Sequence, residues 1–106
     1  MARLSQVEAA GEHLVTEDLR RKGYRMRPSM REWRMVILAA EAGTNRLLVA
    51  VTATAAPEEP PSLSREKEGV VKAQAAEQGA EAWEARVQVD ERRLRLTRSI
   101  GWRRLR

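Results

Sequence analysis

The chain reads MVILAAEAGTNRLLVAV from residue 35 to residue 51, which is two apolar runs separated by a short polar segment. Both runs are rich in Val, Ile, Leu and Ala, and continuous apolar runs of this length are typical of strands that are buried on both faces. We therefore predict two neighbouring strands, over residues 33–40 and 46–54, at the buried centre of a sheet. The polar segment 41–45 is expected to form the turn between them.

A helix is predicted ahead of this centre, because apolar residues recur at spacings of three and four over residues 4–22. Gly23 follows three cations and is expected to end the helix in the left-handed conformation. Gly11 lies inside the helix, where it costs about 1 kcal/mol against Ala, so we expect another element to approach the backbone there. A short edge strand over residues 24–27 is predicted to stop at Pro28, which has no N–H for a ladder.

A loop, a second helix and a fourth strand are predicted after the centre. Three prolines within residues 56–62 favour an extended loop. Ser64 is expected to cap a helix that runs to Gly79. Residues 83–89 alternate apolar and polar side chains, which predicts a strand with one buried face.

The end of the chain is predicted to complete the sheet. Asp90-Glu91 is expected to turn the chain into a hairpin partner over residues 92–98, and residues 99–106 are either an extension of that strand or a basic tail. Together these elements predict one α/β domain over residues 1–106. Their order is αβββαββ, which implies a mixed central sheet with flanking helices.

The composition restricts the chemistry of the chain. It has no Cys and one His, so disulfides and thiolate metal sites are excluded and no metal site is predicted. No phosphate-binding glycine loop occurs, and no cofactor is expected. No apolar run approaches the ~20 residues that span a bilayer, and the N-terminus lacks the apolar block of a signal peptide, so we expect a cytoplasmic location and no membrane partner. Many Arg and Glu with a single Asn are typical of a heat-adapted protein or of GC-rich coding.

The net charge of +5 is unevenly distributed. Residues 20–34 contain seven bases and one acid, residues 92–106 contain seven Arg and no acid, and residues 57–91 between them contain nine acids and four bases. Two basic stretches that meet in the fold would form a surface suited to the backbone of DNA or RNA, whereas separate ones would be ordinary solvated faces. The residues predicted to contact phosphates are Arg20, Arg21, Lys22, Arg25, Arg27, Arg31, Arg34, Arg95, Arg98, Arg103 and Arg104.

Three segments, taken with the order of elements, resemble a nuclease superfamily. They are Gly11-Glu12 in the first helix, Leu19-Arg20-Arg21-Lys22-Gly23-Tyr24 at its end, and Lys72-Ala73-Gln74-Ala75-Ala76-Glu77-Gln78-Gly79 in the second helix. The chain is similar in these respects to the PD-(D/E)xK superfamily, near the Holliday-junction-resolvase-like domains and the YraN-type predicted endonucleases. The resemblance implies a restriction-endonuclease-like core over nearly the whole chain.

The resemblance also implies which residues a nuclease of this kind needs. One Asp on the second strand and a Glu-x-Lys on the third hold Mg²⁺ and stabilise the charge on a phosphate. The matching positions here are Val36, Ala50 and Thr52, and of the usual acidic set only Glu12 is present. A single carboxylate does not make such a metal site, so we predict a catalytically inactive relative that binds nucleic acid non-specifically through its basic stretches.

Two other functions are open to the same residues. Glu41, Glu58 and Glu59 offer carboxylates for a displaced site, which would make the chain a Mg²⁺-dependent endonuclease. Alternatively, a sheet edge or the segment around Trp102 would pair with a second copy or dock to another protein.

The aromatic residues beside the basic stretches suggest a further kind of contact. Trp33 and Trp102 lie among Arg residues and are the better candidates for stacking on bases. Trp83 alternates with apolar residues and is predicted to lie in the core.

Overall fold

The structure is a computed structural model that describes residues 4–32 and 35–106. Its elements are α1 (Leu4–Arg21), β1 (Arg25–Glu32), β2 (Met35–Ala42), β3 (Asn45–Ala55), α2 (Arg65–Gln78), β4 (Glu81–Val89) and β5 (Gly101–Leu105). The predicted order αβββαββ is confirmed. Within these residues, no helix is long and apolar enough to cross a lipid bilayer.

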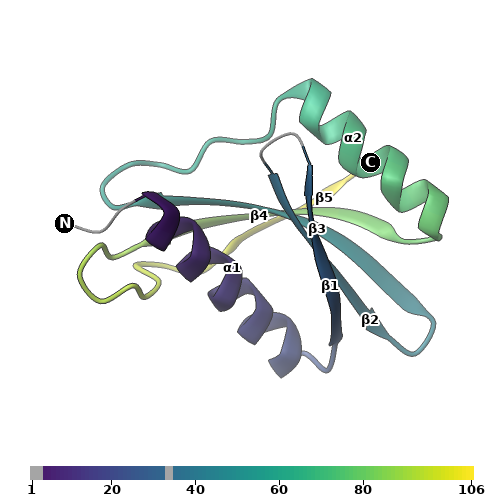
Figure 1. Cartoon of the computed structure of the whole chain (residues 1–106), viewed down its shortest axis with the longest axis horizontal. Helices are drawn as coiled ribbons and strands as arrows, with labels where there is room; N and C mark the ends of the chain where they lie inside the picture. The colour runs from purple at the N-terminus through teal and green to yellow at the C-terminus, as the bar shows by residue number, and fades with distance from the viewer. Residues whose placement is uncertain (1–3, 33–34) are drawn as a thin grey trace.

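The strands form one mixed sheet in the order β1-β2-β3-β4-β5. β1, β2 and β3 pair antiparallel as a meander, β3 and β4 pair parallel, and β4 and β5 pair antiparallel. A parallel pair needs a long crossover connection, and the segment that contains α2 supplies it. The two helices lie on opposite sides of the sheet (Figure 1).

Apolar side chains fill the space between the sheet and each helix. On one side, Val15 and Leu19 of α1 share a core with Val49 of β3. On the other side, Val71 of α2 shares a core with Ala50. Adjacent residues of β3 therefore face opposite helices, as the pleat of a strand requires. This arrangement confirms that the apolar runs form the buried centre of the sheet.

Gly11 is where α1 makes its closest approach to the sheet. A Cβ placed on Gly11 would lie 2.4 Å from the Cβ of Ala53 in β3, which is closer than two carbon atoms can approach. Only a residue without a side chain permits this contact. The close approach predicted at Gly11 is confirmed, and it sets the position of α1 over β3.

The predicted ends of α2 are also confirmed. The Oγ of Ser64 accepts a hydrogen bond from the backbone N–H of Lys67 at 3.3 Å, which satisfies one of the free donors at the start of the helix. Gly79 follows the last turn with a φ of 63°, in the left-handed region that glycine adopts without strain.

β1 is an edge strand, as predicted, but the prediction that it stops at Pro28 was wrong. The strand continues to Glu32, and its pairing with β2 shifts register between Arg27 and Met30. Pro28 lies inside this irregular segment. A bulge on a sheet edge accommodates proline because no ladder hydrogen bond is required of its nitrogen there.

The hairpin partner predicted over residues 92–98 does not form a strand, and only Leu96 of this range pairs antiparallel with β4, in a single bridge to Val89. The Oδ1 of Asp90 accepts hydrogen bonds from the backbone N–H groups of Arg92 (3.0 Å) and Arg93 (2.8 Å), which holds a turn where a strand was expected. Side-chain acceptors of this kind compete with a strand ladder for the backbone donors. The strand that pairs antiparallel with β4 is β5, which begins at Gly101.

Candidate functional site

The four positions that resemble the catalytic residues of a nuclease do not all meet at one place, although two of them, Val36 and Thr52, line the same small cavity. Ala50 is fully buried on the α2 side of the sheet, and Thr52 follows on the same side of β3. Val36 belongs to the core on the α1 side. Glu12 of α1 forms an ion pair with Arg31 of β1 at 3.6 Å. The four positions are therefore divided between the two sides of the sheet.

A buried carboxylate lies next to Ala50. In the pairing of β3 with β4, Ala50 is opposite Glu84, whose side chain is 0% exposed. Its Oε2 accepts a hydrogen bond from the backbone N–H of Leu63 at 2.6 Å, and its Oε1 accepts one from Nε of Arg103 at 3.0 Å. Arg103 also lies 3.7 Å from Glu68 of α2. Both oxygens of Glu84 are thus engaged in joining β5 and the loop before α2 to the centre of the sheet.

The hydrogen bond to Glu84 raises the pKa of Arg103 above its ordinary value, against a smaller opposing effect of burial. The guanidinium therefore stays charged at every pH at which the fold persists. The alternation over residues 83–89 predicted a strand with one buried face, and the burial of Glu84 on the other face contradicts this prediction. The alternation of polar and apolar residues is the same whether the polar face meets water or a helix, so the sequence carries no signal for this site.

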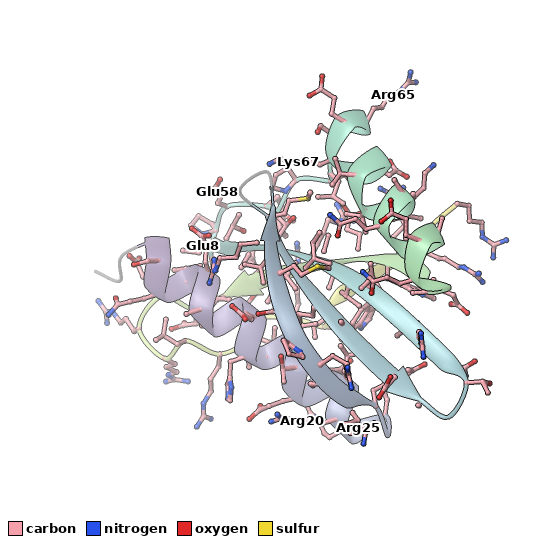
Figure 2. The ribbon with its side chains drawn as sticks, turned by 45° about the vertical axis from the view of Figure 1, so that its right-hand side comes forward. Glu8, Arg20, Arg25, Glu58, Arg65 and Lys67 are labelled. Atoms are coloured by element: carbon pink, nitrogen blue, oxygen red, sulfur yellow. The ribbon has the colours of Figure 1, made fainter. Side chains whose placement is uncertain are left out.

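A small cavity opens where β2 begins. Its volume is about 230 Å³, and its lining includes Val36 and Thr52 together with Glu8 of α1 and Lys67 of α2. Figure 2 shows Glu8 and Lys67 at the same end of the molecule. The cavity thus combines one carboxylate with one ammonium. Across residues 4–32 and 35–106, no group of three or more His, Cys, Asp or Glu side chains is arranged to hold a metal ion.

The carboxylates suggested for a displaced site are far apart. Glu41 of β2 is paired with Arg46, near the start of the 11-residue strand β3. Glu58 and Glu59 follow the end of β3, roughly 30 Å away. Hydrogen bonds hold two of them with cations: Arg25 lowers the pKa of Glu41, and Arg98 lowers the pKa of Glu59. Glu41 therefore does not share a site with the other two.

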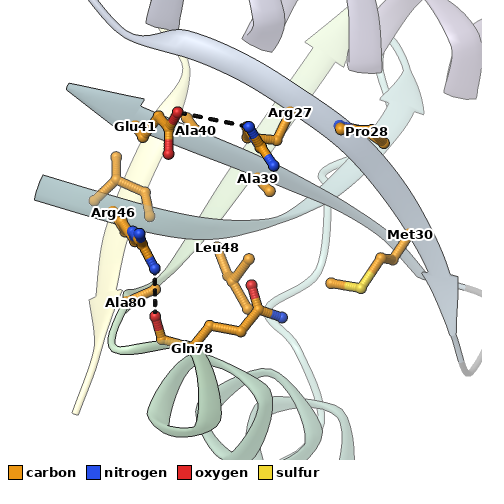
Figure 3. Close-up of a pocket in the computed structure, with 11 residues that line it drawn as sticks. Arg27, Pro28, Met30, Ala39, Ala40, Glu41, Arg46, Leu48, Gln78 and Ala80 are labelled. Atoms are coloured by element: carbon orange, nitrogen blue, oxygen red, sulfur yellow. Dashed lines mark hydrogen bonds and ion pairs between the residues drawn. The ribbon is translucent and has the colours of Figure 1, made fainter. Parts of the chain in front are cut away.

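A larger cavity, of about 460 Å³, opens on the α2 side of β1, β2 and β3 (Figure 3). It is present because α2 packs on β3 and β4 and leaves this side of β1 and β2 open. Leu48 forms part of its floor. Its two cations are engaged: Nη1 of Arg27 lies 3.9 Å from Glu41, and Nη1 of Arg46 donates to the carbonyl of Gln78, at the end of α2, at 3.4 Å.

Most of the predicted phosphate contacts have carboxylate partners. These pairs are Lys22 with Asp18 (2.8 Å), Arg25 and Arg27 with Glu41 (2.6 and 3.9 Å), Arg31 with Glu12 (3.6 Å), Arg98 with Glu59, Arg103 with Glu84 (3.0 Å) and Arg104 with Glu81 (3.8 Å). Arg34 lies outside the described residues, as does Trp33. Considering only the part of the chain that the structure describes, Arg20, Arg21 and Arg95 have no carboxylate within ion-pair distance.

The end of α1 brings several cations to one place. Gly23 takes a φ of 93°, its N–H donates to the carbonyl of Arg20 at 3.0 Å, and the N–H of Tyr24 donates to the carbonyl of Leu19 at 3.0 Å. This is the Schellman motif that a helix followed by glycine favours. It confirms the predicted end of the helix. It also turns the chain so that Tyr24 follows directly beside the basic last turn.

Three aromatic side chains form a hollow at this end of α1. Its volume is about 300 Å³, and it is lined by Leu19, Lys22, Tyr24, Leu47, Trp83 and Trp102. Trp83 and Trp102 meet edge to face, with ring centroids 6.3 Å apart and planes at 82°. The Nζ of Lys22 lies 4.7 Å from the centroid of the Trp102 ring, in a cation–π contact. We call this feature the aromatic hollow.

The aromatic hollow joins the two basic stretches of the sequence. Lys22 belongs to the first and Trp102 to the second, and Arg104 is opposite Trp83 in the pairing of β4 with β5. We call Arg20, Arg21, Lys22 and Arg104 the basic cluster. Arg20 and Arg25 lie at the same end of the molecule in Figure 2. Arg25 and Arg27 are nevertheless separate from the cluster, because they project with Glu41 and Ala39 on the α2 side.

No known family model matches the chain, and no curated protein matches it.

Proposed function

We propose that this chain binds nucleic acid along the sugar–phosphate backbone, without regard to base sequence, and that it does so without cleaving it. The observation that carries the proposal is the pair Arg20 and Arg21, which project from the end of α1 with no carboxylate partner in residues 4–32 and 35–106. A guanidinium presents several N–H donors in a plane that suits a phosphate group. Lys22 and Arg104 extend the same cationic surface across to β5.

The charges at this surface favour an anionic partner. The basic cluster has four cations, and two carboxylates, Asp18 and Glu81, pair with its members. The remaining charge of +2 corresponds to Arg20 and Arg21, which have no carboxylate partner in the described residues. Arg104 is about half exposed and pairs loosely with Glu81 at 3.8 Å, so a phosphate can replace Glu81 at little cost. The resemblance to nucleases stays a prediction on which this charge argument does not depend.

The absence of cleavage follows from the residues at the place where a nuclease would need its carboxylates. Ala50 and Thr52 carry no acidic group there, and the neighbouring Glu84 has both oxygens held by Leu63 and Arg103. A carboxylate so engaged is not available to bind a metal ion. The adjacent cavity offers one carboxylate, Glu8, where phosphodiester hydrolysis with Mg²⁺ needs several converging oxygens.

The basic cluster is tested by fluorescence anisotropy with a labelled single-stranded oligonucleotide of mixed sequence. The test variant is Arg20→Gln with Arg21→Gln, and the matched control is Arg65→Gln with Lys67→Gln. Both variants remove two positive charges, and Figure 2 places Arg65 and Lys67 at the opposite end of the molecule from Arg20. We expect the test variant to bind about tenfold more weakly, and the slope of log affinity against log salt to fall by about 1.4 between about 50 and 200 mM salt.

The control variant should bind as the original chain does. Equal weakening by both variants would mean that overall charge, and not this surface, attracts the nucleic acid. No binding of single strands or duplexes at low salt would refute the proposal entirely.

The second half of the proposal is tested by incubating branched, nicked and single-stranded substrates with Mg²⁺ or Mn²⁺. We expect no cleavage above the background of a heat-denatured sample. Cleavage that disappears in Glu8→Ala or Glu12→Ala would instead establish a displaced nuclease site. Glu8 lines the cavity that contains Val36 and Thr52, and Glu12 is the one acidic residue that the resemblance to nucleases retains.

A further inference from the structure

We propose that the aromatic hollow holds one unpaired base of a single-stranded nucleic acid. This inference rests on the proposed function, because it adds a site for a base to the site that the basic cluster provides for the phosphates of the same strand. The hollow has about 300 Å³, which is at the small end of the range for ligand pockets and suits one planar group. It takes in Tyr24, Trp83 and Trp102, three of the four aromatic residues of the chain.

These three rings are more exposed than expected for a chain that has so few aromatic residues. Phe is absent and aromatics are 4% of the chain, so a core would be expected to enclose them. All three rings are instead half-buried, with one side against the α1 core and the other toward the hollow. Base–aromatic stacking needs such an accessible ring, and it tolerates any base because every base has a planar face.

The polar groups of the hollow suit the edge of a base. In the described residues, the hydroxyl of Tyr24 has no hydrogen-bond partner and can donate or accept. Nε1 of Trp83 donates to Oε1 of Glu81 at 3.1 Å, which holds the ring in place. Lys22 already occupies part of the Trp102 face as a cation, and the ammonium can move from the ring to a phosphate when a base arrives.

The occupant has to be unpaired. A base within a duplex is stacked on both faces and paired along its edge, so it does not enter a hollow in a protein without leaving the helix. A single-stranded nucleic acid offers an unpaired base and its phosphate together. One nucleotide can therefore contact both the aromatic hollow and the basic cluster.

A second copy of this chain is a weaker candidate for the same hollow. In a two-fold dimer the same surface meets itself, so the basic cluster of one copy would face that of the other. Juxtaposed like charges oppose association, whereas the phosphates of a nucleic acid neutralise them.

The test compares two oligonucleotides of equal length, oligothymidylate and the same backbone without bases. We expect the original chain to bind oligothymidylate about tenfold more tightly than the abasic strand. Trp102→Leu should remove the preference, so that this variant binds oligothymidylate no more tightly than it binds the abasic strand. Trp102→Phe, which keeps a ring, should retain most of the preference. The thermal unfolding midpoint of each variant checks that it is folded, and Tyr24→Leu tests the same hollow if Trp102→Leu does not fold.

Equal binding of the two strands by the original chain would overturn this inference and leave backbone binding in place. Failure of both strands to bind would overturn the inference together with the proposed function. A dimer in light scattering that is lost in Trp102→Leu would also overturn it, because the hollow would then be covered by a second copy.

Discussion

The two sides of the sheet are packed by different means, although the same strands build both. On the α1 side, aliphatic residues form the core and half-exposed aromatics border it. On the α2 side, small residues such as Ala50 and Ala75 leave room for a fully buried charged group, Glu84. Trp83 and Glu84 are neighbours on β4 and belong to opposite sides. The α2 side is therefore held partly by an ion pair, and the α1 side carries the aromatic hollow.

The coverage of the sheet differs in the same way. α1 lies close to β3 because Gly11 has no side chain, and it packs on several strands. α2 packs on β3 and β4 and leaves the cavity of Figure 3 beside it. Contacts on the α2 side are fewer, so each polar link there matters more to the stability of the fold.

The largest effect is expected from Arg103→Met, which removes the cation from Glu84. Breaking a buried ion pair costs about 3–5 kcal/mol, because one charge is left buried without a partner. Arg103 is 44% exposed and water can partly replace it, so we expect a loss of about 2 kcal/mol. Urea unfolding monitored by circular dichroism measures this change.

The neighbouring residue provides the control for this prediction. Arg104 is similarly exposed but pairs loosely with Glu81 at 3.8 Å, so Arg104→Met should cost less than about 0.5 kcal/mol. Combining Glu84→Leu with Arg103→Met should recover part of the loss, since the buried carboxylate is then removed together with its cation. The recovery is incomplete because the N–H of Leu63 loses its acceptor and Glu68 loses its nearby cation. Equal costs for the two arginine variants would show that the buried pair does not stabilise the α2 side.

The next effect compares the two helical glycines. Gly11→Ala places a methyl group 2.4 Å from Ala53, and the cost of overpacking exceeds the gain in helix propensity, so we expect a net loss of about 1–2 kcal/mol. Gly69 of α2 has no atom within 4 Å of the corresponding position, so Gly69→Ala should instead stabilise by up to about 1 kcal/mol. Urea unfolding of both variants measures the difference. Stabilisation by both variants would mean that α1 moves away from β3 without cost.

Local signals allowed part of this fold to be predicted from the sequence. Some of these signals act through the backbone, as at the glycines in positions 11, 23 and 79. Others act through continuous burial, as in the two apolar runs. Both kinds depend on few distant residues. The pairing of β4 with β5 was mislocated because Asp90 binds its own following backbone N–H groups, and alternating Arg and Leu do not reveal that competition.

The candidate site was less accessible to prediction. The aromatic hollow joins Tyr24, Trp83 and Trp102, which come together only through the pairing of β4 with β5 and the position of α1. The basic residues were found by counting charge, but their partners were not. Glu41 pairs with Arg25 across β1 and β2, and Glu81 pairs with Arg104, so the cations that stay unpaired could not be identified from the sequence.

The smallest effect concerns the turn after β4, on the loop that carries Arg92, Arg93 and Arg95. A hydrogen bond from the backbone N–H of Arg93, with another from Arg92, lowers the pKa of Asp90 below its ordinary value. A carboxyl whose pKa is lower in the folded state stabilises the fold above its unfolded pKa of about 3.9, and this contribution is lost as the pH falls through the folded value. Asp90→Ala should therefore lower the urea midpoint at neutral pH by less than Arg103→Met or Gly11→Ala does.

The difference between the original chain and Asp90→Ala should shrink as the pH falls below about 4 and vanish once Asp90 is protonated in both states. Glu91→Ala is the control, since no hydrogen bond to the Glu91 side chain occurs in the described residues, and it should leave the midpoint unchanged. A difference that persists undiminished at low pH would mean that the carboxylate charge does not hold the turn. In that case the turn would depend on the packing of Leu94 and Leu96 against the α1 core, and its stability would belong to the apolar side of the sheet.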